Sequence, residues 1–298
     1  TPAGRDSLRR NLDIDRLDYV FITHTHPDHC GLMEELEQAG ATVVLSRYDL
    51  FDQFSINTGI DSLKNIFSGL GFPQSEIGVL GEILRSFKEK IHLPKRYHVL
   101  EEERTLLDEL GVDYLACPGH TQSDIVYLVG DQVVTGDSIL KGIFQVPLLD
   151  VDYHDPGRRF DNYAAYCRSI SKLHGLKGRI LLPGHREAVS DLAEGLLFYV
   201  RKMIERAAVA APYLRDGCSV YQTVHHLFPS SQIPTPFVKY LKTSEVAFVA
   251  DFLADPLPLV SALREQGLLP AVFKPLLDLF GPAVFETGSN SKLAQEVE

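Results

Sequence analysis

Four side chains that can bind a metal ion lie close together near the start of this 298-residue chain. The segment His24-Thr25-His26-Pro27-Asp28-His29 directly follows the apolar run 18–22, which is typical of a buried strand. Because side chains alternate along extended backbone, we expect His24 and His26 to point the same way. Asp28 and His29 would face a second point, where the chain turns into a helix over 28–39. Zinc and related transition metals prefer imidazole and carboxylate ligands, so the segment predicts a metal site and not a solvated loop.

Three further ligands are predicted downstream, because a pair of metal ions needs more ligands than one segment supplies. Each candidate follows a strand-like run: His120 follows 112–116, Asp137 follows 132–134, and His185 follows 178–180. A Pro-Gly pair precedes both His120 and His185. Proline ends strand pairing and glycine permits a tight turn, so both imidazoles should project from a strand end. The spacing therefore predicts a two-metal site assembled at the ends of several strands.

The ordered series His-x-His-x-Asp-His, Pro-Gly-His-Thr, Gly-Asp-Ser and Pro-Gly-His resembles the metallo-β-lactamase superfamily over residues 1–190. Within that superfamily it is more similar to the glyoxalase II and ribonuclease Z branch than to true β-lactamases. The resemblance implies an α/β fold, the αβ/βα sandwich, with two metal ions at the edge between two sheets. It also implies the ligands: His24, His26 and His120 for one ion, Asp28, His29 and His185 for the other, and Asp137 as a bridge. The expected cofactors are two divalent ions, Zn²⁺ first, with Mn²⁺ and Fe²⁺ as alternatives.

Two positions separate this chain from other branches of the superfamily, and one feature departs from the family's pattern. True β-lactamases carry a cysteine where Asp137 stands, which argues against β-lactam hydrolysis, and di-iron redox branches carry a glutamate at the position of His26. The family's domain normally begins with several strands before the histidine motif, whereas this chain opens at Thr1, without Met, shortly before it. We therefore expect the N-terminal strands to be missing from the chain, which would leave a sheet edge with unpaired backbone groups.

The composition is that of a globular, acidic protein. Hydrophobic residues make up 45% and charged residues 23%, and 29 Lys and Arg stand against 40 Asp and Glu, for a net charge of −11. This balance disfavours a broad nucleic-acid surface, so the expected partner is a small-molecule substrate. The four cysteines show no paired motif, which indicates reduced thiols and a cytoplasmic location. No apolar run reaches the roughly 18 residues of a membrane-spanning helix, and no membrane partner is expected.

Two regions are predicted along the chain, a metal-binding domain over 1–190 and a mainly helical C-terminal region over 191–298. Within the first, apolar residues at helical spacing over 47–93 predict a helical insertion. This insertion either packs on the flank of the sandwich or forms a lid over the substrate. The apolar stretch 252–285 is expected to bury against the core or to form a homodimer interface.

The segment 138–156 directly follows Asp137 and has little periodicity. Loops that follow such a strand commonly supply substrate contacts. Lys141, Tyr153 and His154 are therefore candidate substrate-binding residues.

The resemblance implies a hydrolase in which a metal-bridging hydroxide attacks, with Asp137 fixing the metal spacing and Asp28 orienting the attacking water. Hydrolysis of a carboxylic ester, thioester or lactone is the first hypothesis, because the apolar insertion and C-terminal region suit an uncharged acyl group. A phosphodiesterase or ribonuclease is the alternative, and the acidic balance counts against it. A mononuclear iron enzyme similar to persulfide dioxygenases, and a sensor with a vestigial site, are further hypotheses.

Overall fold

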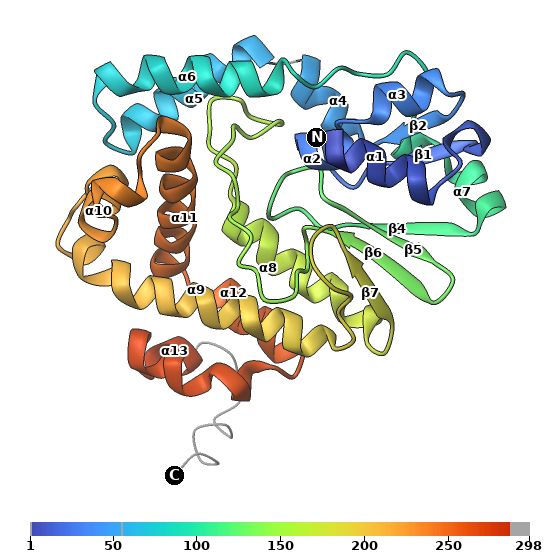
Figure 1. Cartoon of the computed structure of the whole chain (residues 1–298). Helices are drawn as coiled ribbons and strands as arrows, with labels where there is room; N and C mark the ends of the chain where they lie inside the picture. Colours follow the sequence, from blue (N-terminus) through green and yellow to red (C-terminus); the bar gives the residue numbers. More distant parts are fainter. Residues whose placement is uncertain (1, 55, 287–298) are drawn as a thin grey trace.

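Two small β-sheets pack against each other in the computed structural model, which describes residues 2–54 and 56–286; both lie on the right in the view of Figure 1. The first sheet is parallel and has the order β1 (Tyr19–Phe21), β2 (Thr42–Leu45), β3 (Tyr97–Val99). The second has the order β4 (Val112–Ala116), β5 (Ile125–Val129), β6 (Gln132–Gly136), β7 (Ile180–Pro183). Strands β4, β5 and β6 are antiparallel, and β7 runs parallel to β6.

Side-chain alternation on β2 shows how the sheets stack. Val44 faces the second sheet and packs with Ile125 and Tyr127, whereas its neighbours Val43 and Leu45 face the opposite side. The Tyr127 hydroxyl also donates a hydrogen bond of 2.9 Å to the Ile22 carbonyl and so ties the two sheets together. Residues 19–21 of the apolar run 18–22 therefore form a strand, as predicted, but its side chains are half-buried and not buried, because β1 lies at the edge of its sheet.

Helices cover both outer faces of the sandwich. On the first sheet lie α2 (Pro27–Cys30) and α3 (Met33–Gln38), and on the second lie α8 (Asn162–Lys172) and α9 (Leu192–Arg215). The other described helices are α1 (Pro2–Asn11), α7 (Arg104–Leu110), α10 (Val220–Leu227), α11 (Pro236–Ala254), α12 (Leu257–Glu265), α13 (Phe273–Phe280) and α14 (Ala283–Glu286). Short 3₁₀ turns occur at η1 (Ile14–Arg16), η2 (Leu100–Glu102), η3 (Leu173–Leu176), η4 (Ser230–Gln232) and η5 (Leu269–Val272). The predicted αβ/βα sandwich is confirmed.

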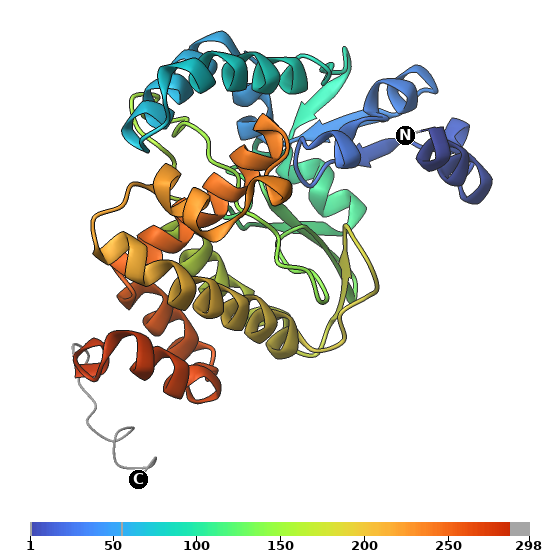
Figure 2. The ribbon, with the colours of Figure 1, turned by 60° about the vertical axis from the view of Figure 1, so that its left-hand side comes forward.

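The helical insertion is also present. It consists of α4 (Arg47–Phe54), α5 (Ile56–Gly69) and α6 (Gln74–Lys88). Phe67 and Leu80 of these helices pack with Tyr240 of α11 and with Leu149 of the long loop, which joins β6 to α8 over residues 137–161. The insertion therefore lies against α11 and the loop after β6, and the two views agree on this placement (Figures 1 and 2).

The C-terminal region shares its core with the sandwich. Leu196 on α9 and Phe248 on α11 belong to the same buried cluster as Val133 and Leu181 of the second sheet. Within the apolar stretch 252–285, Leu263 and Leu276 are also buried in this cluster. The stretch therefore packs on its own chain, while the homodimer stays a prediction. The division at residue 190 also stays a prediction, and residues 287–298 lie outside the described part.

Two boundaries differ from the sequence-based expectation. The helix predicted over 28–39 is divided into α2 and α3, because the chain bends at Gly31, where a Cβ would lie 2.3 Å from the Pro27 carbonyl oxygen. The strand before His185 is β7, not 178–180, because the buried Leu181 pairs with Val133. Helix α8 begins at Asn162, where the Asp161 side chain accepts a hydrogen bond from the Ala164 backbone N–H of its first turn.

The residues before β1 form α1 and η1, and β1 lies at an edge of its sheet. That further strands precede this edge stays a prediction. Among the described helices, none by itself has both the length and the hydrophobicity to cross a membrane; α11 and α12 meet the test only as a pair, bent by 84°. Cys30, Cys117, Cys167 and Cys218 form no disulfide within the described part of the chain.

Candidate metal centre

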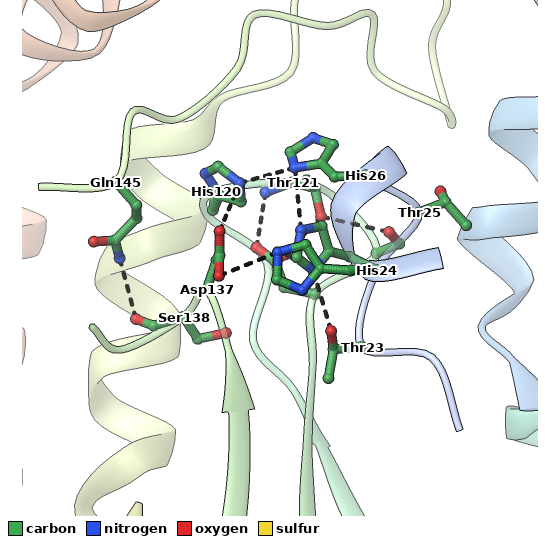
Figure 3. A network of polar contacts seen from close by, with 12 residues as sticks. Thr23, His24, Thr25, His26, His120, Thr121, Asp137, Ser138 and Gln145 are labelled. Atoms are coloured by element: carbon green, nitrogen blue, oxygen red, sulfur yellow. Dashed lines mark hydrogen bonds and ion pairs between the residues drawn. The ribbon is translucent and has the colours of Figure 1, made fainter. Parts of the chain in front are cut away.

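Seven predicted ligands come together where the ends of four strands meet. His24 and His26 follow β1, His120 follows β4, Asp137 follows β6, and His185 follows β7. The other two ligands, Asp28 and His29, lie on the short helix α2. Figure 3 shows His24, His26, His120 and Asp137 pointing toward a common space.

The first group consists of three histidines. The Nδ1 atom of His26 lies 3.1 Å from Nε2 of His24 and 3.1 Å from Nε2 of His120. All three ligand atoms lie within 4.8 Å of one another. The His24 ring is fully buried, and the His120 side chain is only 9% exposed. This grouping matches the one predicted for the first ion.

The second group lies closer to solvent. Asp28 Oδ2 lies 3.7 Å from Nε2 of His29 and 3.3 Å from Nε2 of His185. The side chain of Asp28 is 60% exposed and that of His185 is 41% exposed. This group therefore faces the side from which water and substrate can approach.

Asp137 lies between the two groups. Its Oδ1 atom is 3.5 Å from Nε2 of His29, and its Oδ2 atom is 3.7 Å from Nε2 of His120 and 3.6 Å from Nε2 of His185. One carboxylate thus reaches ligands of both groups, which is the position predicted for a bridge.

The environment keeps the first group neutral. Burial lowers the pKa of His24 and of His26 well below the usual value of 6.5, and the neighbouring histidines lower both further. Burial also lowers the pKa of His120, although Asp137 opposes the effect. A neutral imidazole has a free lone pair, which is the form that binds a metal ion.

His29 and Asp137 behave as an interacting pair. Burial lowers the pKa of His29, but contact with Asp137 and its charge outweigh burial and raise the pKa overall. Burial raises the pKa of Asp137, but contact with His29 and the charges of His120, His29 and His185 together lower it. The carboxylate is therefore held in its charged, ligating form.

Two buried atoms support the fit to metal ions. Among the described residues, His29 Nε2 and Asp137 Oδ1 have no hydrogen-bond partner, although a buried polar atom without one is costly. Both atoms point into the ligand cluster, and a cation there would satisfy both. Gly184 also leaves room for them, because a Cβ at this position would lie 2.5 Å from His29 Cε1 and 2.8 Å from Asp137 Oδ1.

A second layer of residues holds the ligands in place. The Val146 carbonyl lies 2.9 Å from Nδ1 of His120, which leaves Nε2 of that ring facing the cluster. On His24, Nδ1 lies 3.2 Å from Thr23 Oγ1 and 4.0 Å from a carboxylate oxygen of Asp124. Burial raises the pKa of Asp124 to about 7, although hydrogen bonds from Thr121 oppose the shift. The sequence reasoning missed Asp124; an acidic residue directly before the apolar strand 125–129 was the available signal.

A cavity of about 390 Å³ opens beside the ligands. His26, Asp28 and His120 line one part of it. The apolar part is lined by Leu84, Phe87 and Ile91 of the insertion, Leu148 and Phe160 of the long loop, and Phe237 and Tyr240 of α11. The insertion therefore forms a wall of this cavity, in keeping with the pocket-forming alternative.

The three predicted substrate contacts lie in different places. Tyr153 lines the cavity. Lys141 does not, because its half-exposed side chain pairs with Glu187 at 3.1 Å on the surface. His154 is exposed and lies 2.9 Å from the Tyr48 hydroxyl, outside the cavity lining. The geometry thus supports only Tyr153, and the sequence reasoning missed Lys88 and Asp150, which line the cavity as an ion pair.

Comparison with known proteins agrees with this architecture. A family model described as the metallo-beta-lactamase superfamily matches residues 1–185. "Metallo-beta-lactamase fold-containing protein ST1585" of Sulfurisphaera tokodaii is 28% identical over 125 residues, which cover 42% of this chain and 46% of that protein. "Probable metallo-hydrolase YqjP" of Bacillus subtilis is 25% identical over 231 residues, covering 74% of this chain and 70% of that protein. The chain thus matches less than half the length of the first relative.

Solved structures show the same fold. The metallo-beta-lactamase family protein TTHA1429 of Thermus thermophilus has a TM-score of 0.61 and 21% identity, over 90% of this chain and 82% of that one. A beta-lactamase domain protein of Burkholderia ambifaria has a TM-score of 0.59 and 16% identity, over 85% of this chain and 74% of that one. Both alignments extend beyond the region that the family model matches, so the likeness includes helices of the C-terminal region.

Proposed function

Because the chain belongs to the metallo-β-lactamase superfamily, we propose that it is a dinuclear metal-dependent hydrolase of carboxylic esters, thioesters or lactones. The family and the His/Asp clusters support a metal-dependent hydrolase. The proposal goes further in three respects. It names an acyl substrate, zinc as the native metal, and a branch similar to glyoxalase II.

One observation carries the choice of substrate: the cavity joins the ligand cluster to a largely apolar space. A scissile carbonyl placed at His26, Asp28 and His120 would leave its acyl group among Leu84, Phe87 and Phe237. Small-molecule sites are commonly built this way, with an apolar body and a few convergent polar groups. A phosphodiester backbone would instead call for cationic side chains, and the one lysine among the described residues that line this cavity is paired with Asp150.

The ligand residues would have different roles. His24, His26 and His120 would hold one ion, and Asp28, His29 and His185 the other, with Asp137 between them. With divalent ions bound, these residues would give the site a hydroxide at neutral pH and a Lewis acid for the carbonyl oxygen. Asp28, the more exposed of the two ligand carboxylates, would orient the attacking water.

A substrate panel tests the proposal. Protein loaded with Zn²⁺ or with Mn²⁺ is assayed with acyl thioesters, aryl esters and lactones, and with a bis-aryl phosphodiester and a short RNA. We expect turnover of acyl substrates that is lost in His24→Ala and kept in His154→Ala, a histidine outside the cluster. Turnover of phosphodiesters alone would overturn the proposal, and activity that requires iron and a persulfide would redirect it to oxidation.

A further inference from the structure

The polar side chains around the cavity are already bonded to the protein. Gln122 donates to the Val151 carbonyl at 2.6 Å and accepts from the Tyr153 backbone N–H at 3.1 Å. Asn162 donates to the Gly119 carbonyl at 2.9 Å, and the Tyr240 hydroxyl donates to the Leu149 carbonyl at 2.7 Å. These groups hold the loops in place, and their bonds direct donors away from a ligand.

The charged side chains away from the metal ligands form a pair. Lys88 Nζ lies 3.1 Å from Asp150 Oδ2, and these side chains are 18% and 21% exposed. The Tyr153 hydroxyl donates to the same oxygen at 3.4 Å. Withdrawing one partner from such a sheltered pair is costly, because the other charge then lacks its counter-ion. A substrate carboxylate would have to compete with Asp150 for Lys88.

Three separate elements build the apolar wall. Leu84, Phe87 and Ile91 come from the insertion, Leu148 and Phe160 from the loop after β6, and Phe237 from α11. Phe87 and Phe237 stack with ring centroids 4.5 Å apart and an interplanar angle of 23°. The volume of about 390 Å³ lies toward the small end of the range for small-molecule sites, roughly 300–1,000 Å³.

We propose that this cavity selects substrates with an uncharged, apolar acyl or arylacyl arm, and that the Lys88–Asp150 pair excludes arms that carry a terminal carboxylate. The inference rests on the proposed function and adds its substrate class. The scissile carbonyl would lie at the metal ligands, and the arm would extend along the apolar wall. Lys88 and Asp150 act as specificity residues that keep the wall electrically neutral.

Matched pairs of aryl esters test this selection. Acetyl, butyryl and octanoyl esters form a chain-length series, and succinyl and suberoyl monoesters add a terminal carboxylate at equal length. We expect kcat/KM to rise about threefold to fourfold for each methylene that becomes buried. The octanoyl ester should exceed the suberoyl ester by at least about tenfold, the size of a charged interaction left uncompensated.

Two variants distinguish the effect of the Lys88–Asp150 charges on selectivity from the effect of the shape of the cavity. Asp150→Asn can keep the hydrogen bond from the Val151 backbone N–H while it removes the carboxylate beside Lys88. We expect it to raise the suberoyl-to-octanoyl ratio of kcat/KM about tenfold or more. In the matched double variant Lys88→Met/Asp150→Asn, which removes both charges, the preference for octanoyl should return.

Calorimetry of octanoate, acetate and suberate binding to the metal-loaded protein gives a readout that does not depend on turnover. Octanoate should bind at least about tenfold more tightly than acetate or suberate. Equal binding of the three, or a suberoyl-to-octanoyl ratio that Asp150→Asn leaves unchanged, would overturn the inference. If acetyl esters are hydrolysed without any dependence on chain length, the inference fails and the proposed function stands. If no ester is hydrolysed but octanoate binds preferentially, the proposed function fails and the cavity assignment stands.

Discussion

His26 shows how crowding sets the chemistry of single residues. Its Nδ1 atom lies 3.1 Å from a nitrogen of His24 and 3.1 Å from a nitrogen of His120. Charged imidazoles at that separation would repel strongly away from water, so burial and mutual repulsion lower the pKa of all three. The cluster is therefore prepared for a cation before one binds.

The lowered pKa of His26 should make the metal-free protein less stable as the pH falls. The pKa of His26 is lower in the folded state than the value of about 6.5 expected in the unfolded chain. Its contribution to stability is therefore fully present above about pH 6.5. It is lost as the pH falls below that value, because only the unfolded state then takes up the proton.

His26→Gln removes this loss. We expect the free energy of unfolding of the variant, relative to wild type, to rise by about 1 kcal/mol as the pH falls from 6.5 to 5.5. Urea titrations in the presence of a chelator measure it, with His154→Gln as the control for losing an exposed ring. Curves for His26→Gln and wild type that stay parallel would contradict the assignment. The raised pKa values of His29 and Asp124 increase stability as the pH falls, in wild type and in His26→Gln alike. The difference between the two proteins therefore isolates the effect of His26.

Asp137 should matter to both groups of ligands. Because its oxygens lie within 3.7 Å of His29, His120 and His185, we expect Asp137→Asn to weaken both metal sites and to lower activity by about 100-fold or more. His185→Ala should weaken only the more exposed site. Metal content after dialysis, measured by mass spectrometry, distinguishes them: one strongly bound ion should remain in His185→Ala and fewer in Asp137→Asn. Equal retention in the two variants would contradict a bridging position.

At the level of single residues, the sequence predicted the ligand cluster because its signals are local. In His-x-His and in Pro-Gly-His at a strand end, the local backbone alone sets where the imidazole rings point. The rest of the fold is not needed for that prediction. Lys141 and His154 were predicted as cavity residues and lie elsewhere, because the path of the irregular loop 138–156 depends on distant packing. Lys88 and Asp150 gave no local signal, since 62 positions separate them along the chain.

Strand ends position the ligands, and a glycine keeps the space between them open. At Gly184 an added Cβ would lie 2.5 Å from His29 Cε1. We expect Gly184→Ala to displace His29 and to reduce metal affinity at the second group about tenfold or more, because ligands must be held within about 0.5 Å. Gly175→Ala is the matched control, since nothing lies within 4 Å of a Cβ there. Zinc titrations compare the two, and unchanged affinity in Gly184→Ala would contradict the packing described.

Contact between the insertion and α11 should be measurable as an energetic coupling. Phe87 and Phe237 stack across this junction with centroids 4.5 Å apart. A double-mutant cycle with Phe87→Ala and Phe237→Ala should give a coupling of about 0.5–1.5 kcal/mol in unfolding free energy. Strictly additive effects would mean that the two elements do not meet there in solution.

The helices and strands were largely predictable from the sequence, but the contacts between them were not. Apolar periodicity predicted the insertion over 47–93, and α4, α5 and α6 occupy it. That its last helix and α11 would enclose one cavity could not be predicted, because the two are far apart in sequence and amphipathic helices fit many surfaces. The structure shows that the insertion lines the cavity, and its role as a lid stays a prediction.

Across the whole molecule, the second sheet depends on the C-terminal helices. Val133 and Leu181 of the sheet are buried with Leu196 of α9 and Phe248 of α11. A fragment of residues 1–190 would expose this face to water, so we expect it to aggregate or to unfold without a cooperative transition. Thermal unfolding monitored by circular dichroism, with the whole chain as control, provides the measurement. A fragment that unfolds cooperatively would show that the predicted boundary separates two independent folding units.

Metal ions located directly would test the central claim. Crystals grown with Zn²⁺ or Mn²⁺ allow an anomalous-difference map to locate bound ions without reference to activity. We predict two peaks about 3.5–4 Å apart. One should lie among His24, His26 and His120, the other among Asp28, His29 and His185, with Asp137 between them. Peaks elsewhere, or no peak in this cluster at saturating metal, would contradict the account.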